Sequence, residues 1–155
     1  MNILHLTDLH INDPKSDNEA LREAYYQEYL SELIEKIKNC EIKKIFITGD
    51  IVNHAKVANY THAKNIIEYL SEKINVSKKD IFFTNGNHDV PREDGNLIQF
   101  EYFSDHFSKD KKIIKSGERY KIFSIDNNDF VLCINSIGNN FTTGLPSEIK
   151  TSIID

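Results

Sequence analysis

Short apolar stretches alternate with longer periodic ones along the first half of the chain. The short stretches are rich in β-branched and aromatic residues, as β-strands are, and in the longer ones apolar residues recur every three or four positions, as in amphipathic helices. The predicted strands are Asn2–Thr7, Lys44–Thr48 and Asp80–Thr84, and the helices between them are Glu19–Asn39 and Tyr60–Lys73. This alternation is typical of a parallel sheet with right-handed crossovers. It predicts an α/β fold with a parallel βαβαβ core and helices packed on it.

The pattern changes after the third strand. Asn96–Phe107 has the composition of a short aromatic helix, and two predicted strands follow it, Tyr120–Ile125 and Phe130–Asn135. The turn between these strands is short and polar, so we expect the strands to be antiparallel and the sheet to be mixed. We also expect Lys109–Lys112 to be a solvated loop and a last helix to begin near Ser147.

Composition narrows the class of protein. The length of 155 residues favours one domain, and 39% hydrophobic and 28% charged residues exclude an integral membrane protein and a disordered chain. The N-terminus lacks the basic leader and cleavage site of a secretory signal. Cys40 and Cys133 lie far apart without a metal-binding spacing, so we expect two buried free thiols in a reducing compartment, and we place the protein in the cytoplasm.

The charge balance of the chain limits the classes of partner that the protein is expected to bind. The net charge is -5, and only three of the nineteen basic residues are arginines. This balance argues against a broad electrostatic surface for nucleic acid. A nucleic acid can still be a substrate, because a metal site can hold a phosphodiester. The partner that we expect is a phosphate ester, and no membrane is expected.

Each of the first three predicted strands ends in threonine and is followed by side chains that suit metal or phosphate chemistry. These side chains are those of Asp8, His10, Asp50, Asn87, His88 and Asp89. In an open parallel sheet the carboxyl ends of the strands lie along one edge, where such folds bind their ligands. The sequence therefore predicts that groups about forty residues apart converge at this edge.

The residue types indicate divalent metal ions. Asp8 and His10 offer a carboxylate and an imidazole, a set that suits Mn, Fe, Zn or Ni better than Mg or Ca. Asp50 follows a glycine that permits a sharp turn, and its carboxylate can be shared between two cations about 3.5 to 4 Å apart. Asn87 adds a neutral oxygen, which holds a cation without repelling an anionic substrate.

The three motifs together resemble those of the calcineurin-like metallophosphoesterases. The motifs are Asp8-Leu9-His10, Gly49-Asp50 and Gly86-Asn87-His88-Asp89, so the resemblance covers residues 3 to about 90. Ile134-Asn135-Ser136, followed by Gly144-Leu145-Pro146, is similar to a segment of the cyclic-nucleotide phosphodiesterase-like branch. The resemblance implies that residues 1–155 are the N-terminal half of one four-layer α/β/β/α domain, and that a C-terminal remainder completes it.

The resemblance also implies a role for each residue. One metal ion would be bound by Asp8, His10 and Asp50, with Asp50 bridging to a second ion that Asn87 also binds. His88 would touch the substrate phosphate or its leaving oxygen, and Asp89 would orient the His88 imidazole. The implied reaction is an in-line attack on phosphorus, in which the two cations neutralise the developing charge.

The chain departs from the family pattern in two ways. Asn53 stands where the family often has aspartate near the metals, which affects the surroundings of the ligands. The family's later histidines have no counterpart, because no histidine follows His106. We therefore expect under-occupied metal sites, with His54 as a further candidate beside the ligands. Of the other histidines, we expect His5 in the core, His62 at the surface and His106 in packing.

The predicted function is that of a metal-dependent phosphoric ester hydrolase, a phosphodiesterase or phosphatase with a dinuclear site. As it stands, the chain is expected to be inactive because ligands are missing. Two alternatives share the sequence features. One is a catalytically inactive metallophosphoesterase-like module for binding or regulation, and the other is a nuclease effector domain of a larger protein.

Overall fold

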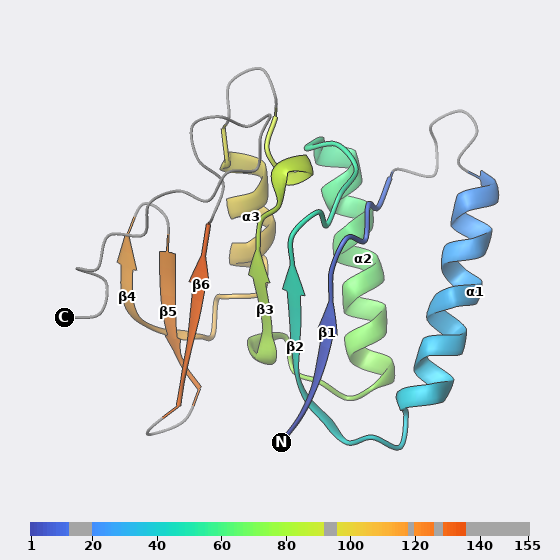
Figure 1. Cartoon of the computed structure of the whole chain (residues 1–155), viewed down its shortest axis with the longest axis horizontal. Helices are drawn as coiled ribbons and strands as arrows, with labels where there is room; N and C mark the ends of the chain where they lie inside the picture. Colours follow the sequence, from blue (N-terminus) through green and yellow to red (C-terminus); the bar gives the residue numbers. More distant parts are fainter. Residues whose placement is uncertain (13–19, 92–95, 118–119, 126–128, 136–155) are drawn as a thin grey trace.

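The computed structural model describes residues 1–12, 20–91, 96–117, 120–125 and 129–135. These residues form six strands, three α-helices and two short 3-10 helices (Figure 1). The strands are β1 (Asn2–Leu6), β2 (Ile42–Thr48), β3 (Ile81–Thr84), β4 (Lys112–Gly117), β5 (Tyr120–Ser124) and β6 (Phe130–Ile134). The helices are α1 (Ala20–Ile37), α2 (Val57–Lys73) and α3 (Ile98–His106), with the 3-10 helices η1 (Lys78–Asp80) and η2 (Asn87–Asp89).

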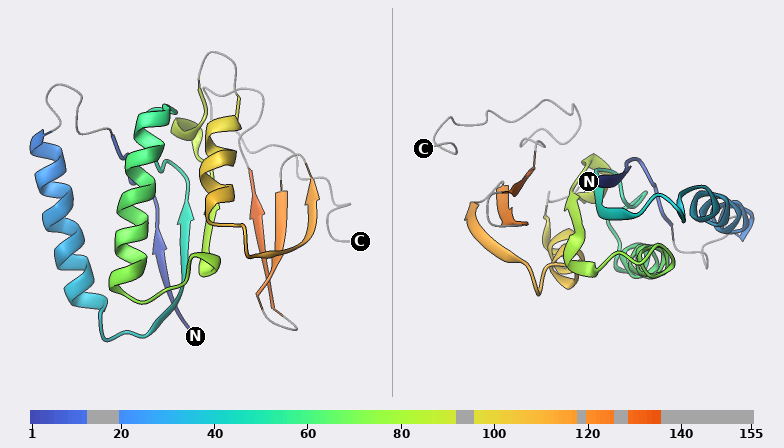
Figure 2. Two further views of the ribbon diagram at one scale, coloured as in Figure 1. Left: turned by 180° about the vertical axis from the view of Figure 1, so that it is seen from behind. Right: turned by 90° about the horizontal axis from the view of Figure 1, so that it is seen from below.

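The first three strands form a parallel sheet in the order β1-β2-β3. The three α-helices lie on one face of this sheet (Figure 2). Side chains alternate along β2, so Ile45 and Ile47 point to the helical face and are completely buried. They share one hydrophobic cluster with Ile67 of α2, Leu30 of α1 and Phe107, which directly follows α3. This cluster is the main core, and it fixes the sheet against the helices.

The opposite face of the parallel sheet carries a smaller aromatic core. Phe46 and Phe82 stack there with their ring centroids 5.3 Å apart. The antiparallel sheet β4-β5-β6 contributes Phe123 and Val131 to the same cluster, and the Phe123 ring lies 5.7 Å from that of Phe82. The second sheet is therefore packed beside β3 through these side chains.

The predicted α/β class and the parallel βαβαβ core are confirmed, whereas the arrangement of the later strands differs. Backbone hydrogen bonds divide the strands between two sheets of three, not one mixed sheet. β4 was not predicted, because every residue of this strand is exposed and its sequence has no apolar alternation. Lys109–Lys112 is not simply a solvated loop, since Lys112 begins β4 and the Lys111 amine donates a hydrogen bond to the Ile81 carbonyl. The helix expected near Ser147 lies outside the described residues.

The cysteines differ in part from expectation. Both are free thiols, as predicted, but Cys40 is exposed and Cys133 is only partly buried. Cys40 follows the end of α1, at a surface position of the α1–β2 connection, so no core surrounds it. Among the described helices, none combines the length and the apolar character that crossing a membrane requires.

Candidate metal centre

The segments that follow β1 and β2 stay paired beyond the ends of these strands. The backbone N–H of Asp8 donates to the Gly49 carbonyl at 3.2 Å, and that of His10 donates to the Asp50 carbonyl at 2.9 Å. A parallel bridge then joins Ile11 to Val52. This continued pairing brings the side chains of Asp8 and His10 next to that of Asp50.

The backbone at these positions has an uncommon conformation. Asp8, His10 and Asp50 have φ angles of 54°, 48° and 49°, in the left-handed region. Only a few per cent of residues other than glycine adopt this region, although aspartate and histidine tolerate it better than most. Such conformations cost about 1–3 kcal/mol each and persist where the surrounding structure holds them. Three of them lie together at one sheet edge, which makes this edge a candidate functional site.

Gly86 allows the β3–η2 turn to pack directly on Asp50. A Cβ atom at Gly86 would lie 2.1 Å from Asp50 Oδ1 and 2.3 Å from the Asp50 backbone nitrogen. Any side chain would therefore separate the two segments. The close approach lets the His88 backbone N–H donate to Asp50 Oδ1 at 2.9 Å, so the third motif holds the carboxylate of the second.

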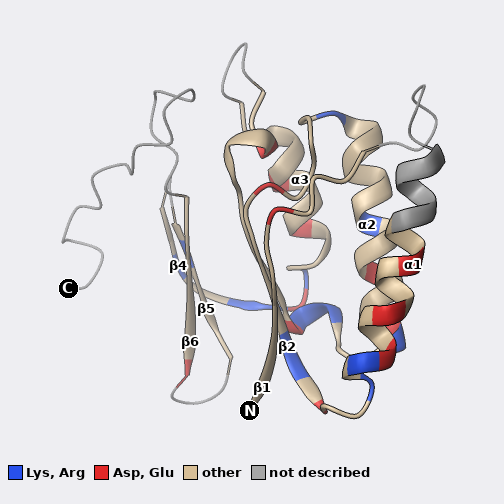
Figure 3. Ribbon diagram, turned by 45° about the vertical axis from the view of Figure 1, so that its right-hand side comes forward, with Lys and Arg blue, Asp and Glu red and all other residues tan. Residues whose placement is uncertain are grey.

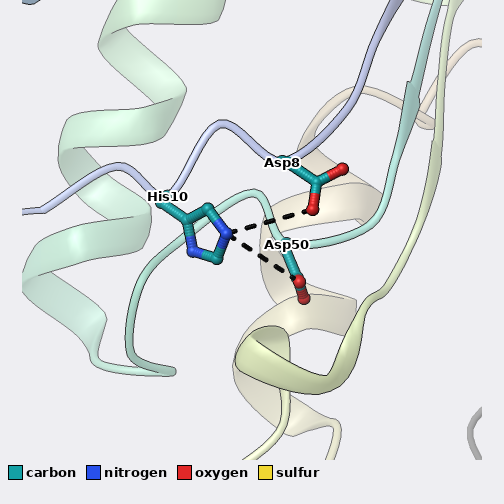
Figure 4. A group of neighbouring side chains, drawn as sticks. All are labelled: Asp8, His10 and Asp50. Carbon is teal, nitrogen blue, oxygen red and sulfur yellow. Dashed lines mark ion pairs between the residues drawn. The ribbon is translucent and has the colours of Figure 1, made fainter. Parts of the chain in front are cut away.

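The side chains of Asp8, His10 and Asp50 converge (Figure 4). His10 Nε2 lies 4.0 Å from Asp8 Oδ1 and 4.0 Å from Asp50 Oδ2, and one donor atom of each residue lies within 4.8 Å of the others. Ligands that bind one ion at about 2.1 Å lie roughly 3–4 Å apart. Two carboxylates and an imidazole at these separations fit a divalent ion such as Mn, Fe, Zn or Ni.

His88 lies beside this cluster. Its ring is edge-on to the His10 ring, with the centroids 4.7 Å apart. His88 Nδ1 lies 2.8 Å from the backbone carbonyl oxygen of Asn53. A carbonyl oxygen only accepts hydrogen bonds, so Nδ1 carries a proton and Nε2 is the nitrogen left for other partners. The imidazole is therefore oriented by the chain that follows β2.

Asp89 has a different role from the predicted one. Its carboxylate is completely buried and accepts hydrogen bonds from the backbone N–H groups of Gly86, Val52 and Ile51, at 2.8, 3.0 and 3.2 Å. The prediction that Asp89 orients the His88 ring is wrong, because the partner of the ring nitrogen Nδ1 is the Asn53 carbonyl and the Asp89 carboxylate binds backbone N–H groups instead. Asp89 instead ties the β3–η2 turn to the segment after β2.

Burial dominates the electrostatics of Asp89. It raises the pKa of this carboxyl to about 6, against the lowering effect of the three backbone hydrogen bonds, and the neighbouring charge of Asp50 raises it further. The Tyr60 hydroxyl donates to the Asp89 carbonyl at 2.9 Å. Burial and the Asp89 charge raise the pKa of Tyr60, so this phenol remains a donor and connects α2 to η2.

The remaining predicted site residues have different outcomes. Asn87 is exposed at the start of η2, directly after Gly86, and its role as a ligand stays a prediction. Asn53 contributes its backbone carbonyl to His88, which a side-chain pattern does not indicate. His54 is exposed, and its carbonyl accepts a hydrogen bond from the Asn59 amide at 2.9 Å. Its place beside the metal ligands also stays a prediction.

The other histidines, His5, His62 and His106, belong to none of the three motifs. His5 was expected in the core but is exposed, with a ring nitrogen 2.6 Å from the Thr48 hydroxyl. β1 is an edge strand, and the second sheet packs beside β3, so this face of β1 is uncovered by the described residues. His62 was expected at the surface and is half-buried. His106 packs edge-on against Phe107, as expected.

Comparisons with known proteins identify the family to which the chain belongs. Residues 1–151 match the family model of the calcineurin-like phosphoesterases. Since the match covers nearly the whole chain, this chain belongs to the calcineurin-like phosphoesterase family. A curated relative from Psychrobacter arcticus, named a probable cyclic nucleotide phosphodiesterase, is 31% identical over 105 residues. These residues cover 64% of this chain and 35% of the relative, so the matched part spans about a third of that protein.

Proposed function

We propose that this chain supplies the N-terminal part of the active site of a metal-dependent phosphoric ester hydrolase. The observation that carries the proposal is the convergence of Asp8, His10 and Asp50, with His88 beside them, at the carboxyl edge of the parallel sheet. Membership of the calcineurin-like phosphoesterase family supports the reaction class. The name of the relative supports a phosphodiester as the substrate class.

Asp8, His10 and Asp50 would hold one divalent ion, and Asp50 with Asn87 would hold a second. Bound cations would stabilise the negative charge that develops on the phosphoryl oxygens. Asp50 suits a shared position because its two oxygens face different neighbours. Oδ1 accepts the His88 N–H at 2.9 Å, and Oδ2 lies 4.0 Å from His10 Nε2. A carboxylate oxygen that accepts one hydrogen bond retains a second lone pair for an ion.

His88 is the proposed acid. The Asn53 carbonyl holds the proton of Nδ1, so a protonated ring can offer only Nε2–H to the leaving oxygen of a substrate. The same contact fixes the plane of the ring, which limits the positions that Nε2 can reach. Asp89 supports this arrangement indirectly, because its carboxylate holds together the two segments that carry His88 and Asn53.

The proposal includes a C-terminal remainder of the domain, of which residues 1–155 are the N-terminal half. The length of the relative, of which the alignment covers 35%, supports this part of the proposal. The remainder would supply further metal ligands, so the present chain is expected to bind metal weakly and to lack activity. A cytoplasmic setting is also proposed, and the free thiols of Cys40 and Cys133 agree with it.

Metal binding by the isolated chain is the direct test. Titration of the chain with Mn²⁺, followed by calorimetry, should show weak binding that Asp50→Asn abolishes. Asp105→Asn is the matched control, because Asp105 is an exposed carboxylate on α3 that pairs with Lys121. Equal Mn²⁺ binding by the Asp50 variant and the control would remove the basis of the proposal.

Activity is tested in the longer protein. A product of the extended reading frame should hydrolyse bis(p-nitrophenyl) phosphate in the presence of Mn²⁺, and Asp50→Asn should abolish this activity. Metal binding without hydrolysis of any phosphate ester would instead indicate a binding or regulatory module.

A further inference from the structure

A cleft of about 640 Å³ lies between the two sheets, at the end opposite to the metal centre. Its charged lining consists of four lysines and two aspartates, namely Lys44, Lys79, Lys111, Lys112, Asp80 and Asp110. These residues come from the beginning of β2, from η1, from the connection between α3 and β4, and from the first position of β4. Figure 3 shows basic residues gathered at this lower end of the sheets and acidic loops at the upper end of β1 and β2.

The cleft is separate from the metal centre. Lys44 lies near the start of β2, and Asp50 follows the end of this strand, six residues later. A strand rises by roughly 3.3 Å per residue, so about 20 Å separate the two positions. A ligand in the cleft would therefore touch none of Asp8, His10 or Asp50.

The charge of the cleft is opposite to that of the whole chain. Four lysines against two aspartates give the lining a surplus of two positive charges, whereas the net charge of the protein is -5. Lys44 is satisfied by Asp80, at 2.8 Å. Lys79 and Lys112 are exposed and have no ion-pair partner among the residues that the structure describes. The surplus positive charge is thus available to a ligand.

Lys111 is the most unusual member of the lining. Its ammonium group donates to the Ile81 carbonyl and lies 4.5 Å from the centroid of the Phe82 ring and 5.1 Å from that of Phe123. Burial lowers the pKa of Lys111 to about 8, although Cys133 and Asp80 act in the opposite direction. The amine has three N–H donors, and a carbonyl takes only one of them. An anion in the cleft would supply the ion-pair partner that Lys111 does not have among the described residues.

We propose that this cleft binds a small phosphate-bearing anion. Lysine ammonium groups are common phosphate ligands, and the volume lies within the range of small-molecule sites. The volume exceeds what a single phosphate group needs, and Phe82 and Ile125 give the cleft an apolar wall. These features favour an organic phosphate over the inorganic ion. The proposal is independent of the proposed hydrolase function, because it uses none of the residues at the metal centre.

The test measures binding by the whole chain after metal ions have been removed on a chelating resin, so that the metal centre cannot contribute. The probes are adenosine monophosphate, an organic phosphate, and pyrophosphate, an inorganic one, each titrated by calorimetry. We expect a Lys79→Gln, Lys112→Gln double variant to bind either probe roughly tenfold more weakly, the effect of losing about 1.4 kcal/mol of charge-assisted contacts. Both substituted side chains are exposed, so the variant is expected to fold.

The matched control is the double variant Lys36→Gln, Lys38→Gln, which removes the same charge from the end of α1 and should bind as the parent does. Asp50→Asn should also bind as the parent does. A second readout is the pKa of the Lys111 amine, measured by NMR, which should rise when the probe saturates the chain. Tighter binding of adenosine monophosphate identifies an organic phosphate, and tighter binding of pyrophosphate identifies an inorganic one. Failure of both probes to bind at millimolar concentration, equal weakening by the control pair, or loss of binding in Asp50→Asn would overturn the proposal.

Discussion

Replacement of Asp89 by asparagine is expected to lower the stability of the fold, and not to act directly on the catalytic step. The carboxylate accepts three backbone hydrogen bonds, two at Oδ2 from Gly86 and Ile51 and one at Oδ1 from Val52. An asparagine has one oxygen and one NH₂ group at these places. If its oxygen takes the place of Oδ2, two bonds are kept, and the Val52 N–H then faces another donor in the protein interior.

The magnitude follows from this count. A buried N–H group that loses its acceptor costs about 1–3 kcal/mol. Part of this cost is offset, because the substitution also removes a charge whose burial raises the pKa of the Asp89 carboxyl to about 6. We expect a net loss of about 1–2 kcal/mol in the free energy of unfolding. With a urea slope of about 2 kcal/mol per molar for a domain of this size, the midpoint should fall by roughly 0.5–1 M.

The assay is urea unfolding followed by far-ultraviolet circular dichroism, since the chain contains no tryptophan. Asp105→Asn is again the control. The Asp105 carboxylate is 61% exposed, so the control should change the free energy of unfolding by less than about 0.5 kcal/mol, which is a midpoint shift of less than roughly 0.25 M. An unchanged midpoint for Asp89→Asn, together with a loss of hydrolysis in the longer protein, would refute this reasoning. It would restore the sequence-based interpretation in which Asp89 acts on His88.

Three further outcomes are expected. Gly86→Ala should weaken Mn²⁺ binding and stability together, because its Cβ would lie 2.1 Å from a carboxylate oxygen of the site; unchanged binding would show that the turn can move. His88→Ala in the longer protein should keep its metal and lower kcat by roughly 10²- to 10⁴-fold for esters with poor leaving groups, and equal losses for activated esters would argue against an acid. Glu68 is partly buried, which raises its pKa, but hydrogen bonds from Lys78 and His106 lower it below the ordinary value overall. A lowered carboxyl pKa stabilises the fold above the unfolded-state pKa, and this contribution is lost as the pH falls through the folded-state pKa. Glu68→Gln should therefore lower the free energy of unfolding by about 0.5–1 kcal/mol near neutral pH and have no effect in acid, and a difference that persists in acid would show that the ion pairs are not its source.

The parallel half of the fold is predictable because its signals are local. The strands around Ile45 and Ile81 are continuous apolar runs, as strands buried on both faces are, and the helical period on α2 is regular. β4 gives no such signal, because it is an exposed strand that exists through pairing with β5. For Lys111, a partner thirty residues away, the Ile81 carbonyl, cannot be inferred from a lysine-rich loop either.

The candidate site also has a part that the sequence predicts and a part that it does not. The donors Asp8, His10 and Asp50 could be predicted because each follows a strand that ends in threonine, and the edge of a parallel sheet collects them. The partner of His88 could not, because it is a backbone carbonyl, and every residue has one. The role of Asp89 was mistaken for a related reason, since its three donors are backbone N–H groups from two segments.

The left-handed backbone at Asp8, His10 and Asp50 has a consequence for how this site changes in evolution. At each position the φ angle lies between 48° and 54°, which glycine adopts without steric penalty. After the entropy of glycine in the unfolded chain is included, a change to glycine at Asp8 or His10 would still gain up to about 1 kcal/mol of stability. At Asp50 this gain is offset, because the change would remove the acceptor of the His88 N–H. Selection for folding alone therefore pushes the positions of Asp8 and His10 away from aspartate and histidine. A family member that has stopped binding metal should drift to glycine or asparagine here first, so these positions distinguish descendants that keep the function from those that keep only the fold.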